Sequence, residues 1–476
     1  MTTLQSAAAS ATPGVQRVAL RLYLLAMIVL EIAAFRSGRD TKLILALAVA
    51  IAFVARGVWL RRPLTRVHAV AALVCLLVAG FAYAWGHSHV AFVAIAVSGP
   101  VLVLPVGSRP EPEEEAHIAS LVRESSGDPL APFALNSTKS YFYNSGRTAA
   151  IGYRTRAGIA VVSGDPVGHP PAFEDLLSDF ACFASGRGWR VAVLGAGEHT
   201  VQLWRSGGRG RPRMRSVCIG CDVIVDVEHF TLVGRRFRNL RQAVHRAENA
   251  GVTTEIVAER DLSPEVRSQL REIVARTRSG HQRRGFSMIL DHLLDGTFPD
   301  MMIVIARDRD MIPVGFQRYG LAHHGDEWSL DVPWRSPRAP NGTDERMAVA
   351  VIDHVHSIGG TSVSLAFAPF PDLLGRNGTG RWRSAVRMAL RLGDSIIALE
   401  SLYRYLDKFH AGADRRFVLF KLRYLLPAAF AMLTFEFVPH REYSPRRDPR
   451  SKSGRSAADL RAEPPHRAAD HRARRT

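Results

Sequence analysis

Long apolar runs separated by short polar breaks fill the first 106 residues of the chain. The runs lie near residues 18–35, 42–60, 67–85 and 88–106. Each is close to the ~20 residues that a helix needs to cross a bilayer. A cleaved signal peptide explains this poorly, because apolar runs keep recurring. The pattern predicts an N-terminal membrane region of about four transmembrane helices, residues 1–106.

Basic residues beside these runs indicate their orientation. Arg61, Arg62 and Arg66 mark the second loop as cytoplasmic under the positive-inside rule. Arg36 and Arg39 in the first loop favour the opposite topology. We expect a multi-pass protein of the cell membrane whose following region is cytoplasmic.

Strand-like and helix-like patterns alternate after a polar, Pro- and Glu-rich linker at 107–115. Runs typical of strands cover 158–162, 190–194, 223–227, 301–306, 314–321 and 362–366. Helical spacing of apolar residues covers 171–186, 232–250, 262–278 and 346–358. The cycle restarts after Gly251, so we predict two α/β (α+β) units, at 116–251 and 252–425.

The C-terminal part of the chain changes character twice. Residues 426–439 are apolar but contain Pro427, which leaves a core helix or a helix in the membrane interface as alternatives. Residues 440–476 are rich in Arg, Pro, Ser and Ala with few large apolar side chains, which predicts a disordered basic tail.

The distribution of charge along the chain indicates which anionic partners it could bind. Of the net charge of +18, residues 1–106 contribute nine Lys/Arg against two Asp/Glu, and residues 440–476 contribute eleven against five. This surplus flanks the membrane region, where anionic headgroups attract cations. The middle of the chain is only mildly basic, which disfavours a general coating by nucleic acid. A local basic face that binds tRNA stays open.

Four cysteines give no metal signature. Cys218 and Cys221 form one CxxC, but no second pair or His pair follows at zinc spacing. Buried apolar roles in a reducing cytoplasm fit them better than metal or redox roles. We expect no metal.

The segment 232–250 carries the densest basic cluster. An apolar stripe at helical spacing predicts a helix that ends at Gly251. Arginines occupy the other positions, and few acids offset them: Arg235, Arg238, Arg241 and Arg246. A solvated basic face and a site for tRNA or lipid phosphate are both open readings.

The segment Arg205–Gly210 (RSGGRG) matches the loose R-x-x-G-x-G pattern of acyl-CoA-binding acetyltransferases. That pattern binds pyrophosphate through backbone N–H groups between a strand and a helix. Here it follows a predicted helix at 200–204 and leads into a strand. We interpret it as a helix-ending loop, with a CoA site as the alternative.

Two polar segments offer the residue types that a transfer site needs. The stretch 329–345 (SLDVPWRSPRAPNGTDE) places acids and a base near predicted strand and helix ends: Asp331, Arg335, Asp344 and Glu345. A second cluster provides cations: Lys408, Arg415 and Arg416. Carboxylates suit an ammonium group, while Lys and Arg suit phosphates. Ordinary salt bridging is the alternative reading.

At these residues the sequence resembles the C-terminal catalytic domain of bacterial phosphatidylglycerol lysyltransferases, also called multiple peptide resistance factors or aminoacyl-phosphatidylglycerol synthases. The matching segments run in family order over about residues 115–425. They are Tyr141–Gly146 (YFYNSG), Gly164–Gly168 (GDPVG), Phe230–Gly251, Ser329–Gly342 (SLDVPWRSPRAPNG), Ser364–Phe370 (SLAFAPF) and Leu402–Phe420. The resemblance implies tandem acetyltransferase-like (GNAT) folds with the active site between them.

The resemblance also implies a reaction. Aminoacyl-tRNA would be the donor and a hydroxyl of phosphatidylglycerol the acceptor, in an ester-to-ester exchange that needs no cofactor and alters membrane surface charge. By analogy, Asp331 would hold the α-ammonium group and Glu345 would orient or deprotonate the attacking hydroxyl. Lys408 and Arg416 would hold lipid or tRNA phosphate.

The chain departs from the family where substrates would be recognised. The family commonly has Asp-Leu-Met-Arg where this chain has Asp331-Val332-Pro333-Trp334, and Gly-Met-Ala-Pro-Leu where it has Ala366-Phe367-Ala368-Pro369-Phe370. The amino acid, the lipid and the oligomeric state therefore stay open. Two alternatives remain: a GNAT-type acyltransferase that uses acyl-CoA or an acyl-carrier thioester, and a non-catalytic lipid-sensing membrane protein.

Overall fold

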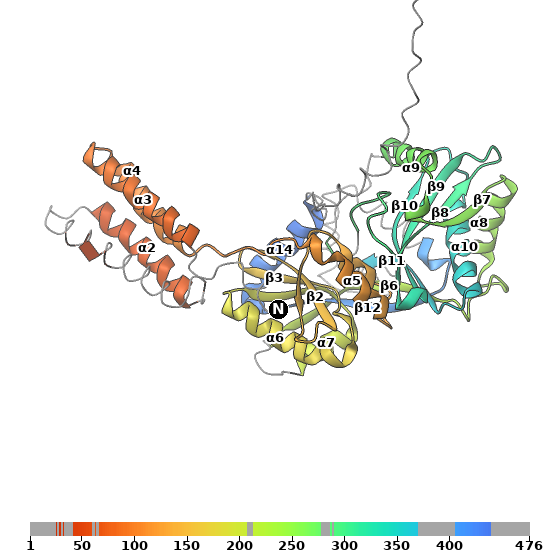
Figure 1. Cartoon of the computed structure of the whole chain (residues 1–476), viewed down its shortest axis with the longest axis horizontal. Helices are drawn as coiled ribbons and strands as arrows, with labels where there is room; N and C mark the ends of the chain where they lie inside the picture. Colours follow the sequence, from red (N-terminus) through yellow and green to blue (C-terminus); the bar gives the residue numbers. More distant parts are fainter. Residues whose placement is uncertain are drawn as a thin grey trace, which may run out of the picture.

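The N-terminal helices stand apart from the rest of the protein in the computed structural model (Figure 1). The structure describes residues 25, 28, 29, 32, 41–59, 62, 66–206, 213–277, 286, 287, 290–369 and 405–438. Three apolar helices pack together: α2 (Thr41–Trp59), α3 (Arg66–Ala84) and α4 (Ser88–Leu102). A Cβ on Gly99 would lie 2.4 Å from the carbonyl oxygen of Ala50, so the contact between α2 and α4 requires a glycine.

Two of these helices are long and apolar enough to cross a membrane, by length and composition: Thr41–Trp59 and Val67–Ala84. Helix α4 is apolar but shorter. The three predicted runs from residue 42 to residue 106 thus correspond to helices. The first predicted span, 18–35, lies mostly outside the described residues, as does the basic tail.

A single twelve-stranded sheet organises the remaining described chain. Its path runs β1-β2-β3-β5-β12-β6-β11-β10-β9-β8-β7, with β4 paired to β2. The strands are β1 (Ser140–Tyr143), β2 (Ala149–Arg156), β3 (Ile159–Ser163), β4 (Val167–Gly168), β5 (Arg190–Ala196), β6 (Arg215–Asp226), β7 (Thr253–Ala258), β8 (Met301–Arg307), β9 (Pro313–Ala322), β10 (Glu327–Arg335), β11 (Ser362–Pro369) and β12 (Gly412–Phe420).

The two centre strands join the halves of this sheet. Strand β6 pairs antiparallel with β12 on one side and with β11 on the other. Strand β12, although late in the sequence, also pairs antiparallel with β5. The chain therefore returns from the second half and inserts a strand beside the first. The division into units at residue 251 stays a prediction, but β12 lies within the sheet of the first half.

Helices cover both faces of the sheet. In the first half, α6 (Phe173–Gly186) and α7 (Glu198–Arg205) bury one set of alternating strand residues, and α14 (Leu425–Phe437) buries the other set. In the second half, α8 (Arg238–Asn249) and α10 (Thr343–Ser357) pack on one face and α9 (Pro264–Arg276) on the other.

Most elements that the apolar pattern predicted are present. The prediction of a helix from residue 232 was wrong at its start, because α8 begins at Arg238. Gly234 has a φ of 95°, and the Arg241 guanidinium donates to the carbonyl oxygens of Leu232 and Gly234, which folds residues 232–237 into a turn. The predicted C-cap is confirmed, since Gly251 has a φ of 84° and its N–H donates to Glu248.

The segment predicted as a linker is attached to the sheet edge. The Glu111 N–H donates to the carbonyl oxygen of Lys139 at 3.1 Å, and the Glu111 carboxylate accepts from the Tyr141 N–H. Burial raises the pKa of Glu111 to about 7 despite that hydrogen bond. Short helix α5 (Glu115–Glu124) then packs four apolar side chains inward.

Candidate functional site

An open cavity of about 1110 Å³ lies where the two halves of the sheet meet. Strand β10, the first turn of α10 and the segment that leads into β12 supply most of its charged groups. Its acidic lining residues are Asp222, Asp331, Asp344 and Glu345, and its basic ones are Arg246, Arg335 and Lys408. The structure thus brings six of the predicted site residues to one cavity, together with Asp222, which the sequence analysis missed.

A β-bulge places Asp331 at this cavity. In the pairing of β10 with β9, Leu330 lies opposite Tyr319 and Val332 opposite Arg318, so Asp331 is the extra residue. Its Oδ1 accepts from the Leu290 N–H at 2.8 Å, and its Oδ2 accepts from Arg318 Nη1 at 3.1 Å. Burial raises the pKa of Asp331 to about 6, although Arg318 opposes the shift.

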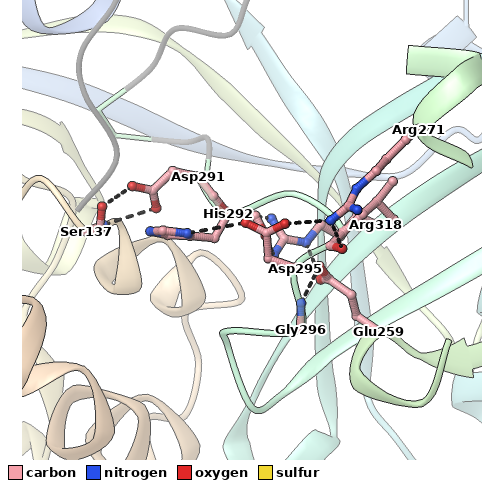
Figure 2. A network of polar contacts seen from close by, with 9 residues as sticks. Ser137, Glu259, Arg271, Asp291, His292, Asp295, Gly296 and Arg318 are labelled. Atoms are coloured by element: carbon pink, nitrogen blue, oxygen red, sulfur yellow. Dashed lines mark hydrogen bonds and ion pairs between the residues drawn. The ribbon is translucent and has the colours of Figure 1, made fainter. Parts of the chain in front are cut away.

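Arg318 is the centre of a buried network behind the bulge (Figure 2). Its Nε donates to Glu259 Oε2 at 2.7 Å, and its Nη1 and Nη2 donate to the carbonyl oxygens of Asp291 and His292. Asp291 in turn accepts from the N–H and hydroxyl of Ser137. The network fixes Asp331, because the Arg318 guanidinium has two carboxylates and two carbonyls around it.

The same network ties down the neighbouring loop. Figure 2 shows Asp295 between His292 and Arg271, at 3.6 Å and 2.9 Å respectively. Glu259 also accepts from the Gly296 N–H at 3.4 Å. These contacts connect α9 and β9 to residues 291–296, which border Asp331.

Glu345 and Lys408 form an ion pair in the lining of the same cavity. Lys408 Nζ lies 2.5 Å from Glu345 Oε1, with the lysine side chain 29% exposed and the glutamate 9% exposed. Glu345 lies in the first turn of α10, where a negative charge is favoured. Gly342 precedes that turn with a φ of 98°, and a Cβ there would lie 2.0 Å from the Ala243 carbonyl oxygen of α8.

A second ion pair sits beside the first. Arg335 Nη1 lies 3.4 Å from Asp344 Oδ2, and the Asp344 carbonyl oxygen accepts from Gln317 Nε2 at 3.2 Å. Gln317 Oε1 accepts from the Tyr319 hydroxyl at 2.8 Å. The turn of α10 is thus held against β9 and β10 by polar contacts.

Asp222 is a fully buried carboxylate that the sequence analysis did not single out. It lies on β6, and its Oδ1 accepts from the Ser364 hydroxyl of β11 at 2.7 Å. Burial raises its pKa to about 6, although Arg416 and Ser364 oppose the shift. The sequence did offer one sign of this residue, because an Asp inside the apolar run 218–227 is unusual for a buried strand.

The predicted cations do not all reach the cavity. Arg416 is buried and contacts three carboxylates: Asp128 at 2.8 Å, Asp165 at 3.2 Å and Asp222 at 3.8 Å. The structure therefore places Arg416 as an internal counter-charge, and the prediction that it holds a substrate phosphate gains no support. Arg415 is exposed on β12.

The arginines around α8 also differ in whether their side chains are available to a ligand. Arg235 and Arg238 are exposed, and Arg246 borders the cavity. Arg241 instead donates from its guanidinium to the backbone carbonyl oxygens of Leu232 and Gly234, and so has a structural role. Exposed arginines thus reach from the surface to the cavity edge.

The loop 205–210 lies largely outside the described residues, although α7 ends at Arg205 and β6 begins at Arg215, as the helix-ending interpretation expected. Among the described residues, no group of three or more His, Cys, Asp or Glu side chains is placed to hold a metal ion.

Comparison with known proteins identifies the family. A model of the family described as "Phosphatidylglycerol lysyltransferase, C-terminal" matches residues 118–420. The chain belongs to this family. It is 44% identical over 400 residues to the MprF-like domain protein Rv1619 of Mycobacterium tuberculosis, covering 84% of this chain and 83% of that protein. The predicted family resemblance is confirmed.

Some relatives are much longer than this chain, and only part of their length matches it. The lysylphosphatidylglycerol biosynthesis bifunctional protein LysX of Mycobacterium avium is 32% identical over 335 residues, which cover 66% of this chain and 27% of LysX. This chain therefore spans about a quarter of the length of LysX.

Solved structures show the same fold. The L-PGS structure from Bacillus licheniformis aligns with a TM-score of 0.57 and 22% identity, over 69% of this chain and 97% of that one. The C-terminal domain of a putative lysylphosphatidylglycerol synthetase from Agrobacterium fabrum aligns with a TM-score of 0.59 and 20% identity, over 70% and 100%. These likenesses confirm a mixed α/β fold.

Proposed function

We propose that this chain is an aminoacyltransferase that moves an amino acid from aminoacyl-tRNA to a hydroxyl of phosphatidylglycerol or a related membrane lipid. The observation that carries the proposal is the charge pattern of the cavity: four carboxylates and three cations face one space between the two halves. An aminoacyl ester brings an ammonium group and the lipid brings a phosphate, so a donor and an acceptor of opposite charge would each find partners.

The family supports the class of reaction. LysX is called a bifunctional lysylphosphatidylglycerol biosynthesis protein, and the Agrobacterium fabrum protein a putative lysylphosphatidylglycerol synthetase. We extend to this chain the transfer of an aminoacyl group to a lipid, and we take each half of the sheet as an acetyltransferase-like unit. A membrane location with the sheet region in the cytoplasm belongs to the same proposal.

The reaction is a balanced ester exchange. The lipid hydroxyl oxygen forms a bond to the aminoacyl carbonyl carbon, and the bond from that carbon to the tRNA ribose oxygen breaks. The hydroxyl proton ends on the ribose oxygen, so no oxidant or nucleoside triphosphate is consumed.

Asp331 is the proposed ligand of the donor's α-ammonium group. Each of its oxygens already accepts one hydrogen bond, from Leu290 and from Arg318. An ionised carboxylate accepts about four, so capacity remains on the cavity side. Arg318 keeps the carboxylate in place and charged, which a cation-binding role requires.

Glu345 is the proposed base for the lipid hydroxyl, and Lys408 the proposed phosphate ligand. In the free protein these two groups neutralise each other across 2.5 Å. A lipid phosphate that binds Lys408 would draw the ammonium from Glu345 and free its carboxylate to accept the hydroxyl proton. Acceptor binding would thus prepare the base.

The test is a transfer assay with the full chain reconstituted in phosphatidylglycerol vesicles and supplied with tRNA charged with labelled amino acids. We expect a new labelled, ninhydrin-positive lipid that disappears after RNase treatment. Transfer from acetyl-CoA without tRNA would support the thioester alternative instead. No labelled lipid from either donor would contradict catalysis and favour a lipid sensor.

A further inference from the structure

Helix α14 presents an apolar face on both of its sides. The buried side, Ala428, Ala431, Met432 and Phe435, packs on β3, β5 and β12. The opposite side carries large apolar residues in one stripe at helical spacing: Leu426, Phe430, Leu433 and Phe437. Exposed Leu422 lies in the short 3-10 turn just before the helix. Leu426 is 80% exposed and Phe430 is 54% exposed. A helix that packs on a soluble core normally turns polar residues outward.

The exposed stripe contains no charge. Glu436 is the single ionisable residue in α14, and its carboxylate turns toward the protein. It accepts from the Ser287 N–H at 2.9 Å and from the Ser287 hydroxyl at 2.6 Å. The outward side of α14 is therefore an uninterrupted apolar surface, which marks an interaction site.

Cations surround this stripe. We call Arg62, Arg156, Arg190, Lys421 and Arg423 the basic collar. The Arg156 guanidinium lies 5.6 Å from the Phe430 ring centre, and those of Arg190 and Arg423 lie 5.6 Å and 4.7 Å from the Tyr424 ring centre. Their charged groups thus border Phe430 of α14 and Tyr424 just before it.

Among the described residues, no ion pair joins any member of the basic collar to a carboxylate. Burial lowers the pKa of Lys421, and the neighbouring charges of Arg423 and Arg190 lower it further. Burial, Arg56 and Arg190 lower the pKa of Arg62 in the same way. An anion between these groups would relieve their repulsion.

The basic collar is also continuous with the apolar helices. Arg62 follows α2 and donates to the Val103 carbonyl oxygen after α4 at 2.9 Å. A Cβ on Gly188 would lie 2.8 Å from Arg62 Cα, and the Trp189 indole N–H donates to Val106 at 2.7 Å. The segments that follow α2 and α4 therefore contact the residues just before β5, and Arg190 at the start of β5 lies against Tyr424 just before α14. Figure 1 shows α14 near the chain that enters from the helices.

We infer that α14 lies in the interface of the bilayer, with its exposed stripe among the acyl chains and the basic collar on anionic glycerophospholipid headgroups. An uncharged Leu/Phe surface edged by Arg and Lys is the composition that binds this layer. The proposed function does not specify such a contact. The sheet region is then held at the membrane by two attachments, the bundle and α14, and not by a flexible tether.

The test places a bimane fluorophore on the full chain reconstituted in vesicles. The label sites are Leu426→Cys and Leu433→Cys, with Val233→Cys as the matched control, since Val233 is 78% exposed on the loop before α8. A Cys182→Ser change removes the exposed native cysteine. Lipids with a spin label on the acyl chain quench fluorophores in the bilayer, and iodide quenches those in water.

We expect strong lipid quenching and weak iodide quenching at residues 426 and 433, and the reverse at residue 233. In vesicles with phosphatidylglycerol, the double change Lys421→Ala and Arg423→Ala should lower the ratio of membrane-bound to water-exposed α14 by roughly tenfold or more. The reason is that each cation near an anionic surface contributes ~1 kcal/mol to binding. In phosphatidylcholine vesicles the same changes have little effect.

Three outcomes would overturn the inference. Iodide quenching at 426 and 433 equal to that at 233 would place α14 in water. Shielding from both quenchers would indicate a protein partner, and if it grew with protein density it would indicate a second copy of this chain. Equal quenching in both lipids, insensitive to the collar changes, would remove the anionic headgroups from the account. None of these readouts depends on transfer activity.

Discussion

Two buried arginines, one in each half of the sheet, hold carboxylates in different ways. Arg318 contacts Glu259 and Asp331, which lie in the second half with it. Arg416 contacts Asp128, Asp165 and Asp222, which come from widely separated parts of the chain. The first cluster therefore shapes one wall of the cavity, whereas the second fastens the returning strand β12 to two segments of the first half and to the centre strand β6.

The balance of charge also differs. Arg318 faces two carboxylates together with backbone carbonyls, and their attraction raises its pKa despite burial. Arg416 faces three carboxylates, which leaves more negative charge than it neutralises. Burial and Asp128 accordingly raise the pKa of Asp165, and burial raises that of Asp222 to about 6. Each cluster thus holds a carboxyl whose pKa burial raises to about 6, Asp331 beside Arg318 and Asp222 beside Arg416. The Arg416 cluster differs by a second carboxyl with a raised pKa, Asp165.

The largest expected effect is on stability. Arg416→Ala removes the shared cation of the buried Asp222 and the partly buried Asp128 and Asp165, so we expect a loss of about 3–5 kcal/mol in the free energy of unfolding. Arg318→Ala leaves two carboxylates and should cost less. Thermal unfolding of the full chain in detergent checks the order, and a smaller loss for Arg416→Ala would contradict the comparison.

The next effect is on transfer. Glu345→Gln should lower the rate constant roughly 10²–10⁴-fold, the usual contribution of a general base. Glu265→Gln is a matched control, because Glu265 occupies the first turn of α9 as Glu345 does that of α10. Equal rates for both variants would remove Glu345 from the chemistry.

A pH effect on stability is expected from Asp222. Its pKa is raised from 3.8 to about 6, so the folded state binds a proton more tightly than the unfolded chain does. Stability from this group is therefore present below about pH 4 and is lost as pH rises through 6. The free-energy difference between wild type and Asp222→Asn should change by on the order of 2–3 kcal/mol across that window. A constant difference would show that Asp222 does not titrate there.

The smallest effect concerns the arginines of α8. If exposed Arg238 contacts tRNA phosphate, Arg238→Ala should weaken donor binding a few-fold and reduce the slope of log affinity against log salt by about 0.7–0.9. Arg276→Ala on α9 is the control, since Arg276 pairs with Glu272 at the surface. The same slope in both variants would leave the α8 face as a solvated surface.

Local periodicity predicted much of this fold. Helix α6 and strands β3 and β5 appear where apolar spacing placed them, because their buried residues recur at helical or alternating positions. Contacts between distant residues escaped it: Asp128, Asp165 and Asp222 meet Arg416 only after β12 inserts beside β5. Family motifs pointed to Asp331, Glu345 and Lys408, yet no spacing in the sequence revealed that Arg318 supports the first or that the other two pair.

The most direct test of the role of Asp331 compares two donors. One is tRNA that carries an amino acid, and the other is the same tRNA carrying the corresponding α-hydroxy acid, in which a hydroxyl replaces the α-ammonium group. If Asp331 holds the ammonium, the wild-type chain should prefer the amino donor by roughly 10–100-fold, the worth of a charge-assisted hydrogen bond. Asp331→Asn should bring that ratio close to one, and a ratio is insensitive to the fraction of folded protein. An unchanged preference in Asp331→Asn would contradict the proposed role of Asp331 at this cavity.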